Sequence, residues 1–233
     1  MGSLFEHLVR RDSRLILLLA PPFDRSLPDP GYIKGYVPGV RENGGQYTHA
    51  AVWASMAFAE MGDSARAWQL LDMINPVSHG LADTIETYKV EPYVLAADVY
   101  AMAPHEGCGG WSWYTGAAGW MYRLILESLL GVQREGPSLR FKPVLPVSWR
   151  GYKLHYRFGA TRYLINLVQT DSVPGGLQVI LDGKRLDDHR MPLVDNGQDH
   201  HVEVHCQPCG PEQPRVWPED RITQKPESGD GAA

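Results

Sequence analysis

The hydrophobic period of the chain changes near residue 135, and this change constrains the fold more than any other feature. Before that point apolar side chains recur at helical spacing, whereas after Gly136 they alternate with polar ones as in β-strands. Helices bury one apolar stripe and strands one apolar face of a sheet, so the two parts are expected to pack separately and the chain to be mainly α plus β. We predict a helical part at 1–135, a small antiparallel β part at 136–210 and a disordered tail at 211–233, which is rich in Pro, Gly, Asp and Glu.

Four helices are expected in the first part, and residues that cap helices stand at their ends. Gly62 and Gly131 suit C-terminal caps, and Asp63 suits an N-terminal cap because its carboxylate can accept from the free amides of the first turn. The connections are short, which is typical of helical hairpins. The predicted helices are residues 47–61, 64–74, 91–102 and 113–130.

The second part is expected to form short strands joined by tight turns. Asp182-Gly183 is a strong signal for a two-residue hairpin turn. Upstream of the helices, residues 14–20 are interpreted as a strand or buried segment with nothing before it to pair with. The long loop that follows, residues 21–46, is of a kind that is usually functional. The predicted strands are residues 139–144, 153–158, 162–168, 177–181 and 202–205.

Composition argues against several classes of function. The 22 Lys and Arg are outnumbered by 27 Asp and Glu, unlike proteins that bind the phosphate backbone of nucleic acids. The longest apolar run, residues 15–22, is too short to cross a membrane and lacks the features of a secretory signal. Three Cys cannot build a disulfide framework, so a reducing compartment is expected.

Two glycine-rich segments that precede helices are candidate anion sites, because free backbone amides and the positive end of the helix dipole meet there. The first is Gly44-Gly45, with His49 in the first turn of the next helix. The second ends in Thr115-Gly116, whose hydroxyl and amide could both donate to an anion. The alternatives are a plain helix cap with a core histidine at His49, and an aromatic core cluster around the second segment.

Aromatic and acidic side chains beside these segments are candidates for sugar contact. Trp111 and Trp113 offer flat apolar faces, and five of the seven Trp precede residue 121. Glu91 could bond to sugar hydroxyls, or could serve only as an acidic first-turn residue of the helix predicted at 91–102. The Cys206-x-x-Cys209 pair near His205 suggests zinc, but it has no second ligand pair at zinc-finger spacing, so no metal site is expected.

These segments resemble glycoside hydrolase family 94, over roughly residues 4–205. The stretch from Pro21 to His49 is most similar to the branch of cyclic β-1,2-glucan synthases and 1,2-β-oligoglucan phosphorylases. The motifs that carry the resemblance are residues 21–24, 29–36, 41–49, 91–93 and 110–116. The resemblance implies the C-terminal part of an (α/α)6 barrel followed by a small antiparallel β-sandwich-like domain.

The resemblance also implies an inverting enzyme of the glycosyltransferase or phosphorylase class. In this class phosphate attacks the anomeric carbon while an Asp protonates the leaving oxygen. The resemblance implies that His49, Thr115 and Gly116 hold the phosphate. It places Tyr36 at the acceptor sugar and Glu91 at the border of the sugar pocket. Inorganic phosphate is then a co-substrate, a β-glucan oligosaccharide the substrate, and no other cofactor is implied.

The chain departs from the family pattern in two respects. The family's catalytic Asp and a phosphate-binding Arg lie upstream of the loop at residues 29–36, and neither Asp24 nor Asp29 matches that acid. No catalytic residue is therefore expected in this chain, which is interpreted as a C-terminal piece that is inactive alone. The disaccharide phosphorylases also carry a Gln where this chain has Ala97 beside Asp98, which favours β-1,2 over cellobiose chemistry.

Other functions stay open on the sequence alone. One is a non-catalytic carbohydrate-binding or regulatory subunit, and another is an inverting α/α-barrel hydrolase that uses water. The expected partners are the missing N-terminal part of such an enzyme or a second copy of the chain. The expected location is the bacterial cytoplasm, with the alternative of a part in a larger membrane-associated synthase.

Overall fold

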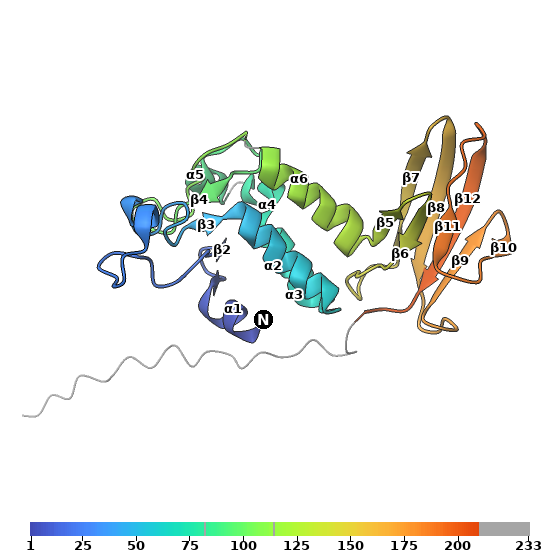
Figure 1. The fold of residues 1–233 in the computed structure, drawn as a ribbon, viewed down its shortest axis with the longest axis horizontal. Helices are drawn as coiled ribbons and strands as arrows, with labels where there is room; N and C mark the ends of the chain where they lie inside the picture. The colour runs from blue at the N-terminus through green and yellow to red at the C-terminus, as the bar shows by residue number, and fades with distance from the viewer. Residues whose placement is uncertain (82, 114, 210–233) are drawn as a thin grey trace, which may run out of the picture.

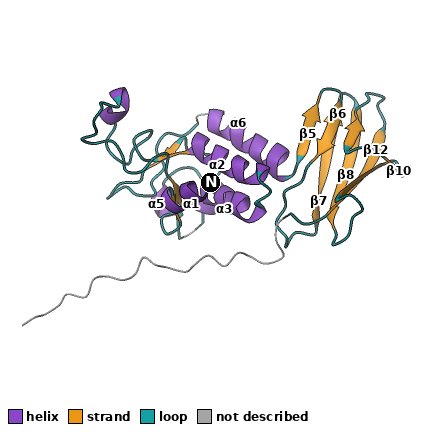
Figure 2. Ribbon diagram, turned by 60° about the horizontal axis from the view of Figure 1, so that its bottom comes forward, coloured by secondary structure: helices purple, strands orange, loops and turns teal. Residues whose placement is uncertain are grey.

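The computed structural model describes residues 1–81, 83–113 and 115–209. The helices, long loops and two short two-stranded sheets lie at one end of the described chain, and the two larger sheets lie at the other (Figure 1). Figure 2 shows the same division by secondary structure. The tail predicted to be disordered, residues 211–233, lies outside the described residues.

Helices α2 (Thr48–Glu60) and α3 (Ser64–Ile74) form the predicted helical hairpin. Gly62, in a left-handed conformation with φ of 75°, makes the turn between them. The Asp63 carboxylate then accepts from the Arg66 amide at 3.1 Å and caps α3 as predicted. The hairpin is tied inside by the buried Ser55 hydroxyl, which donates to the Ala67 carbonyl at 2.8 Å.

The last helix of this part starts later than predicted and changes its winding. Trp113 has a φ of 63°, so α6 begins at Thr115 rather than at 113 and runs as Thr115–Arg123. A π-helical segment, η2 (Leu124–Leu129), continues it, and the Leu130 amide donates to the Ile125 carbonyl at 2.8 Å. Gly131 ends the helix with a φ of 73°, as predicted.

The helix predicted at residues 91–102 is wrong. That segment begins with a turn at residues 92–94 and contains β4 (Asp98–Val99), which pairs antiparallel with β3 (Gln46–Tyr47). The Ala97 amide donates to the Trp111 carbonyl at 2.6 Å, so backbone groups that a helix would use internally go to neighbouring segments instead. Helix formation is limited nearby to α4 (Pro76–His79) and α5 (Ile85–Tyr88).

The N-terminal segment also differs from its prediction. The strand expected at 14–20 is the short β2 (Leu15–Ile16), and it does have a partner before it, β1 (Val9–Arg10), which follows α1 (Gly2–His7). The loop that follows contains only the 3-10 turn η1 (Gly31–Gly35). Asn43 holds this loop together, since its amide donates to the carbonyls of Phe23 and Tyr36 and its oxygen accepts from the Phe23 amide.

The strand-rich part consists of two sheets. Their order is β10-β9-β12-β8-β7 in one and β11-β6-β5 in the other. The strands are β5 (Val132–Glu135), β6 (Ser138–Phe141), β7 (Gly151–Phe158), β8 (Thr161–Gln169), β9 (Leu177–Leu181), β10 (Lys184–Arg185), β11 (Arg190–Pro192) and β12 (Asp199–Cys206). Since β5 pairs with β6, the boundary predicted at 135/136 falls inside a hairpin.

All five predicted strands are present, but the sheet is not purely antiparallel as expected. β12 pairs parallel with β8 and antiparallel with β9, because the chain returns to the middle of the sheet after β11. Asp182-Gly183 forms the predicted two-residue turn, with φ of 50° and 80°. One buried cluster joins the inner faces of both sheets, which makes them two packed layers; its members include Leu139, Phe141, Tyr163, Ile165 and Val204.

The helical part and the sheets meet through α3. Trp68 packs against the buried clusters of both parts, and its indole Nε1 donates to the Val144 carbonyl at 2.7 Å. An ion pair adds to this junction, with Lys142 Nζ 2.7 Å from Glu60 Oε1. The helical hairpin that carries the candidate site is thereby fixed to the sheets.

The buried imidazole of His79 on α4 is expected to make the chain less stable in mild acid. Burial lowers the pKa of this imidazole, whose Nε2 is 2.6 Å from the Met73 carbonyl and whose ring stacks on Tyr88. The unfolded chain therefore binds a proton near pH 6.5 that the folded chain resists, so the free energy of unfolding falls as pH drops below 6.5. In urea titrations at pH 7.5 and 5.5, His79→Phe should lose less stability between the two values than the wild type.

A matched control for this prediction is His105→Phe, because His105 is exposed in a loop. That variant should keep the wild-type difference between pH 7.5 and 5.5. An equal difference in the His79 variant and the wild type would contradict the assignment.

Candidate functional site

The starts of α2 and α6 lie at the same end of the helical part, and the two helices run side by side (Figures 1 and 2). His49, in the first turn of α2, stacks on Trp120 of α6 with ring centroids 5.7 Å apart. Its other ring neighbour is Trp53, at 4.5 Å. Thr115 and Gly116 are exposed and open α6. The three residues predicted to bind phosphate thus lie on two adjoining helices, α2 and α6, whose N-termini are at the same end of the helical part.

Arg41 joins two of the predicted sugar residues. Its guanidinium carbon lies 4.5 Å from the centroid of the Trp111 ring and 5.5 Å from that of Tyr36. Arg41 Nε is 3.7 Å from Glu42 Oε2, which places an opposite charge beside it. Trp111 remains 50% exposed, so part of the residue is open to solvent beside these charges.

The other two predicted sugar residues also meet. The indole Nε1 of Trp113 donates to Glu91 Oε1 at 3.2 Å, and both side chains are exposed. Both Trp113 and Arg41 have positive φ, 63° and 49°, a conformation that costs roughly 1–2 kcal/mol outside glycine. Strained residues of this kind cluster at functional sites, and here they flank the predicted site from two loops.

The sequence analysis did not assign a role to Asp98, which the structure places at the centre of this region. Asp98 is only 1% exposed, and its Oδ1 accepts from the Trp111 amide at 3.0 Å. Burial raises the pKa of this carboxyl, while Arg41 opposes the rise and Glu42 adds to it. The available signal in the sequence was an acidic residue within the apolar stretch 94–99.

A raised pKa is a property that a catalytic acid needs, but the geometry does not suit Asp98 for that role. A general acid must come within hydrogen-bond reach of the oxygen it protonates. The Asp98 carboxylate is covered by Gly110, where an added Cβ would lie 2.6 Å from Oδ2. Asp98 therefore lies behind the candidate site rather than in it.

Several buried polar atoms near the start of α2 have no hydrogen-bond partner among the described residues. Buried polar groups are normally satisfied, so a set of this kind marks a place suited to a polar ligand. The atoms on the site side of this region are Arg41 Nε, Glu42 Oε2, Thr48 Oγ1 and His49 Nε2. The set combines donors and acceptors, which matches the hydroxyl and anion chemistry predicted from the sequence.

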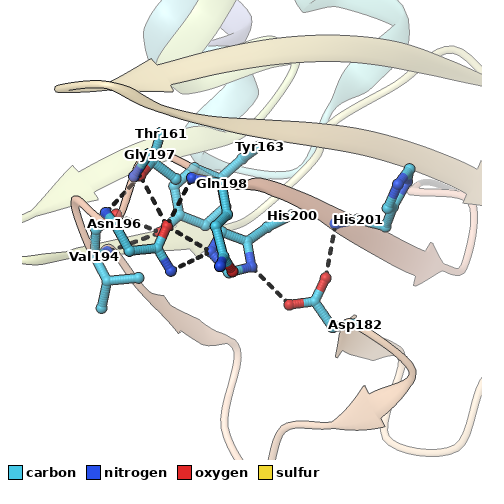
Figure 3. Close-up of polar contacts among 9 residues, drawn as sticks. All are labelled: Thr161, Tyr163, Asp182, Val194, Asn196, Gly197, Gln198, His200 and His201. Carbon is cyan, nitrogen blue, oxygen red and sulfur yellow. Dashed lines mark hydrogen bonds and ion pairs between the residues drawn. The ribbon is translucent and has the colours of Figure 1, made fainter.

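A second polar cluster lies in the sheets and contains an acid–histidine pair (Figure 3). His200 Nδ1 is 2.7 Å from Asp182 Oδ2, and the Asn196 side chain approaches its Nε2 at 3.2 Å. The imidazole also stacks on the buried Tyr163 ring. Both ring nitrogens are thus occupied and no nucleophile adjoins them among the described residues, so the cluster ties the β9–β10 turn to the loop before β12.

A groove lies away from the helix starts, on the outer face of the five-stranded sheet. It encloses about 380 Å³ and is lined by outward side chains of β7, β8 and β12, among them Lys153, His155 and Glu203. Within the described residues no three His, Cys, Asp or Glu side chains are grouped to hold a metal ion. Cys206 and Cys209 instead lie against the carbonyls of Val168 and Pro143.

Residues 1–131 match the sequence profile of the glycosyl hydrolase 94 superfamily, catalytic domain. The chain belongs to this family. The profile covers all five motif segments that carry the resemblance, and the resemblance predicted from the sequence is confirmed. No helix of the described residues is both long and apolar enough to span a membrane.

The relatives that resemble the chain are, by name, a glucan synthase and several phosphorylases. It is 48% identical over 176 residues to the cyclic beta-(1,2)-glucan synthase NdvB of Rhizobium meliloti, covering 75% of this chain and 6% of that protein. It is 29% identical to the 1,2-beta-oligoglucan phosphorylase of Listeria innocua, over 49% of this chain and 12% of that protein. It is 31% identical to the N,N'-diacetylchitobiose phosphorylase of Vibrio furnissii, over 73% of this chain and 21% of that protein. The chain thus spans a quarter or less of these glycosyl hydrolase 94 relatives.

Proposed function

We propose that the chain supplies the phosphate- and sugar-binding half of the site in an inverting enzyme of the β-glucan phosphorylase or cyclic β-1,2-glucan synthase type. The observation that carries the proposal is that α2 and α6 run side by side with their starts at the same end, where His49 of α2 stacks on Trp120 in the second turn of α6. Membership of the family supports an enzyme of the glycosyltransferase or phosphorylase class. In longer proteins of this type the α2–α3 hairpin would be one unit of an (α/α)6 barrel.

Phosphate is proposed to bind at the start of α6. The Thr115 hydroxyl and the Gly116 amide donate there, and the helix dipole favours an anion. His49 approaches the same region from α2, with an Nε2 that has no partner among the described residues. The imidazole can donate to a phosphate oxygen, which holds the nucleophile in position without any covalent step by the protein.

The sugar is proposed to lie along the aromatic and charged side chains of the two loops. Trp111 and Tyr36 offer ring faces, and Arg41 and Glu42 offer a donor and an acceptor for adjacent hydroxyls. The Glu91–Trp113 pair borders this area. The protonation of the leaving oxygen is assigned to an Asp outside this chain, so the chain by itself is expected to bind without turnover.

This function is tested by phosphate and sugar binding to the 233-residue chain. Titration with inorganic phosphate in the presence of the β-1,2-linked glucose disaccharide, followed by calorimetry, should show saturable binding. His49→Ala should weaken phosphate binding about tenfold or more, since a charge-assisted hydrogen bond is worth about 1.5–3 kcal/mol. The control is His155→Ala, on the outer sheet face, which should bind phosphate like the wild type.

The alternatives give different results in the same titration. Disaccharide binding that is saturable and indifferent to phosphate supports a non-catalytic carbohydrate-binding role. Release of glucose without phosphate supports a hydrolase. Phosphorolysis of a β-1,2-oligoglucan by the purified chain would refute the assignment of the acid to another segment, and a wild-type chain that binds neither ligand would overturn the proposal as a whole.

A further inference from the structure

Asp98 is a buried carboxylate that phosphate and sugar binding, as proposed above, do not use. It lies on β4, directly beneath the glycine-rich segment that leads to α6. Its backbone carbonyl accepts from the Gly110 amide at 2.8 Å, and its side chain accepts from the Trp111 amide at 3.0 Å. Asp98 thus holds two successive backbone amides of this loop, those of Gly110 and Trp111. The Trp111 ring is part of the proposed sugar site.

The packing around Gly110 shows how closely this loop and the carboxylate are fitted. A Cβ built on Gly110 would lie 2.6 Å from Asp98 Oδ2 and 2.7 Å from Oδ1. Any side chain at position 110 would therefore push the carboxylate away or lift the loop. Glycine lets the loop backbone rest on the carboxylate, as happens where two segments must approach closely.

Asp98 also acts on the cation that stacks against the same ring. The Arg41 guanidinium favours the ionised form of Asp98, and it lies 4.5 Å from the Trp111 ring centroid. Trp111 is thereby held on two sides, by the Asp98 carboxylate at its amide and by Arg41 at its ring. Moving the carboxylate would release the Trp111 amide and, with it, the ring against which Arg41 packs.

We propose that Asp98 is a positioning residue for the sugar site, which fixes Trp111, and through it Arg41, in the orientation that receives a sugar. The proposal rests on the function proposed above. Asp98 does not touch the ligand, because Gly110 covers its carboxylate and the residue is 1% exposed. Its effect reaches the sugar only through the Trp111 backbone and the Arg41 charge.

The electrostatics distinguish this role from plain structural support. Burial outweighs the neighbouring Arg41 and raises the pKa of the Asp98 carboxyl above its ordinary value, so its ionised form costs stability at neutral pH. A folded-state pKa above the unfolded one means that stability is lost as pH rises through it. Replacing the carboxylate with a neutral amide of the same shape should then stabilise the chain.

The test compares Asp98→Ala with Asp98→Asn in the full chain, by hydrogen exchange of the Trp111 amide and by titration with the β-1,2-linked glucose disaccharide. In D98A the Trp111 amide should exchange at least tenfold faster and the disaccharide should bind about tenfold more weakly. In D98N the amide oxygen replaces the lost acceptor, so exchange and affinity should stay within about threefold of wild type while Tm rises.

Matched variants keep the test decisive. Asp199→Asn, in an exposed ion pair of the sheets, should leave exchange, affinity and Tm unchanged. If D98A does not fold, Asp98→Ser replaces it, because a Ser hydroxyl is too short to reach the Trp111 amide. Unchanged Trp111 exchange in the short variants overturns the proposal, as does a D98N chain that loses protection like D98A.

The exchange measurement separates this proposal from the proposed function. If the wild-type chain binds no disaccharide, the proposed sugar site fails, and the exchange of Trp111 still decides whether Asp98 positions that residue. If the disaccharide binds and D98A exchanges Trp111 like wild type, the sugar site stands and the role of Asp98 fails.

Discussion

Gly131→Ala is expected to lower the free energy of unfolding by about 3 kcal/mol or more, because no side chain fits at the junction of η2 and β5. Gly131 has a φ of 73°, which by itself costs an alanine roughly 1–2 kcal/mol. An added Cβ would also lie 2.2 Å from the carbonyl carbon and oxygen of Lys142 and 2.3 Å from Pro143 N. Urea unfolding followed by circular dichroism measures the loss.

The chain supplies a matched control at Gly136, which turns β5 into β6. Its φ of 60° is similar, yet nothing lies within 4 Å of an added Cβ. Gly136→Ala should therefore show the backbone cost alone, about 1–2 kcal/mol, and the difference between the two variants isolates the contact with residues 142–143. Equal losses in the two variants would contradict the crowding at Gly131.

The elements that the sequence predicted correctly are those whose signals are local. The cap at Asp63, the turn at Asp182-Gly183 and the end of the helix at Gly131 each depend on a few adjacent residues. Strand β9 was predicted with its observed bounds, Leu177–Leu181, because alternation and a strong turn coincide there. Local signals of this kind need no knowledge of the partner segment.

The errors concern pairing between distant segments. Residues 91–102 carry a Pro-started apolar pattern that suits a helix, yet Asp98 pairs with Tyr47 and the Ala97 amide bonds to Trp111. The parallel pairing of β8 with β12 is likewise decided by tertiary contacts. Short strands of two residues are stabilised by such contacts more than by their own propensity.

The candidate site shows the same limit. Family motifs named His49, Thr115, Tyr36 and the two tryptophans as candidates. In the structure Tyr36 and Trp111 both pack against Arg41, whereas His49 packs against Trp120 and Trp113 bonds to Glu91. Their motifs lie in loops and in the first turns of helices, where residue types reflect function more than core packing. Asp98 was missed as a functional residue because its proposed role depends on burial beneath Gly110, which lies on a different segment of the chain, and no spacing rule predicts that contact.

Phe58→Ala is expected to cost about 3–5 kcal/mol, because it removes the aromatic ring at the centre of the helical core. Phe58 on α2 is 0% exposed and packs edge-on against Phe5 of α1, with ring centroids 5.9 Å apart. The Arg66 guanidinium of α3 lies 5.4 Å from the same ring centroid. One side chain thus contacts three helices, and the cavity left by Ala would loosen all of them.

The effect of Phe58→Ala should reach the proposed phosphate site, since His49 begins the same helix. The loss is measured as the shift in the urea midpoint, together with the phosphate affinity of the folded chain at low temperature. Tyr122→Ala on α6 is the control: that side chain is 67% exposed, so its removal should change stability by about 0.5 kcal/mol or less. A Phe58 variant as stable as the Tyr122 variant would mean that the hairpin does not depend on its buried aromatic contacts.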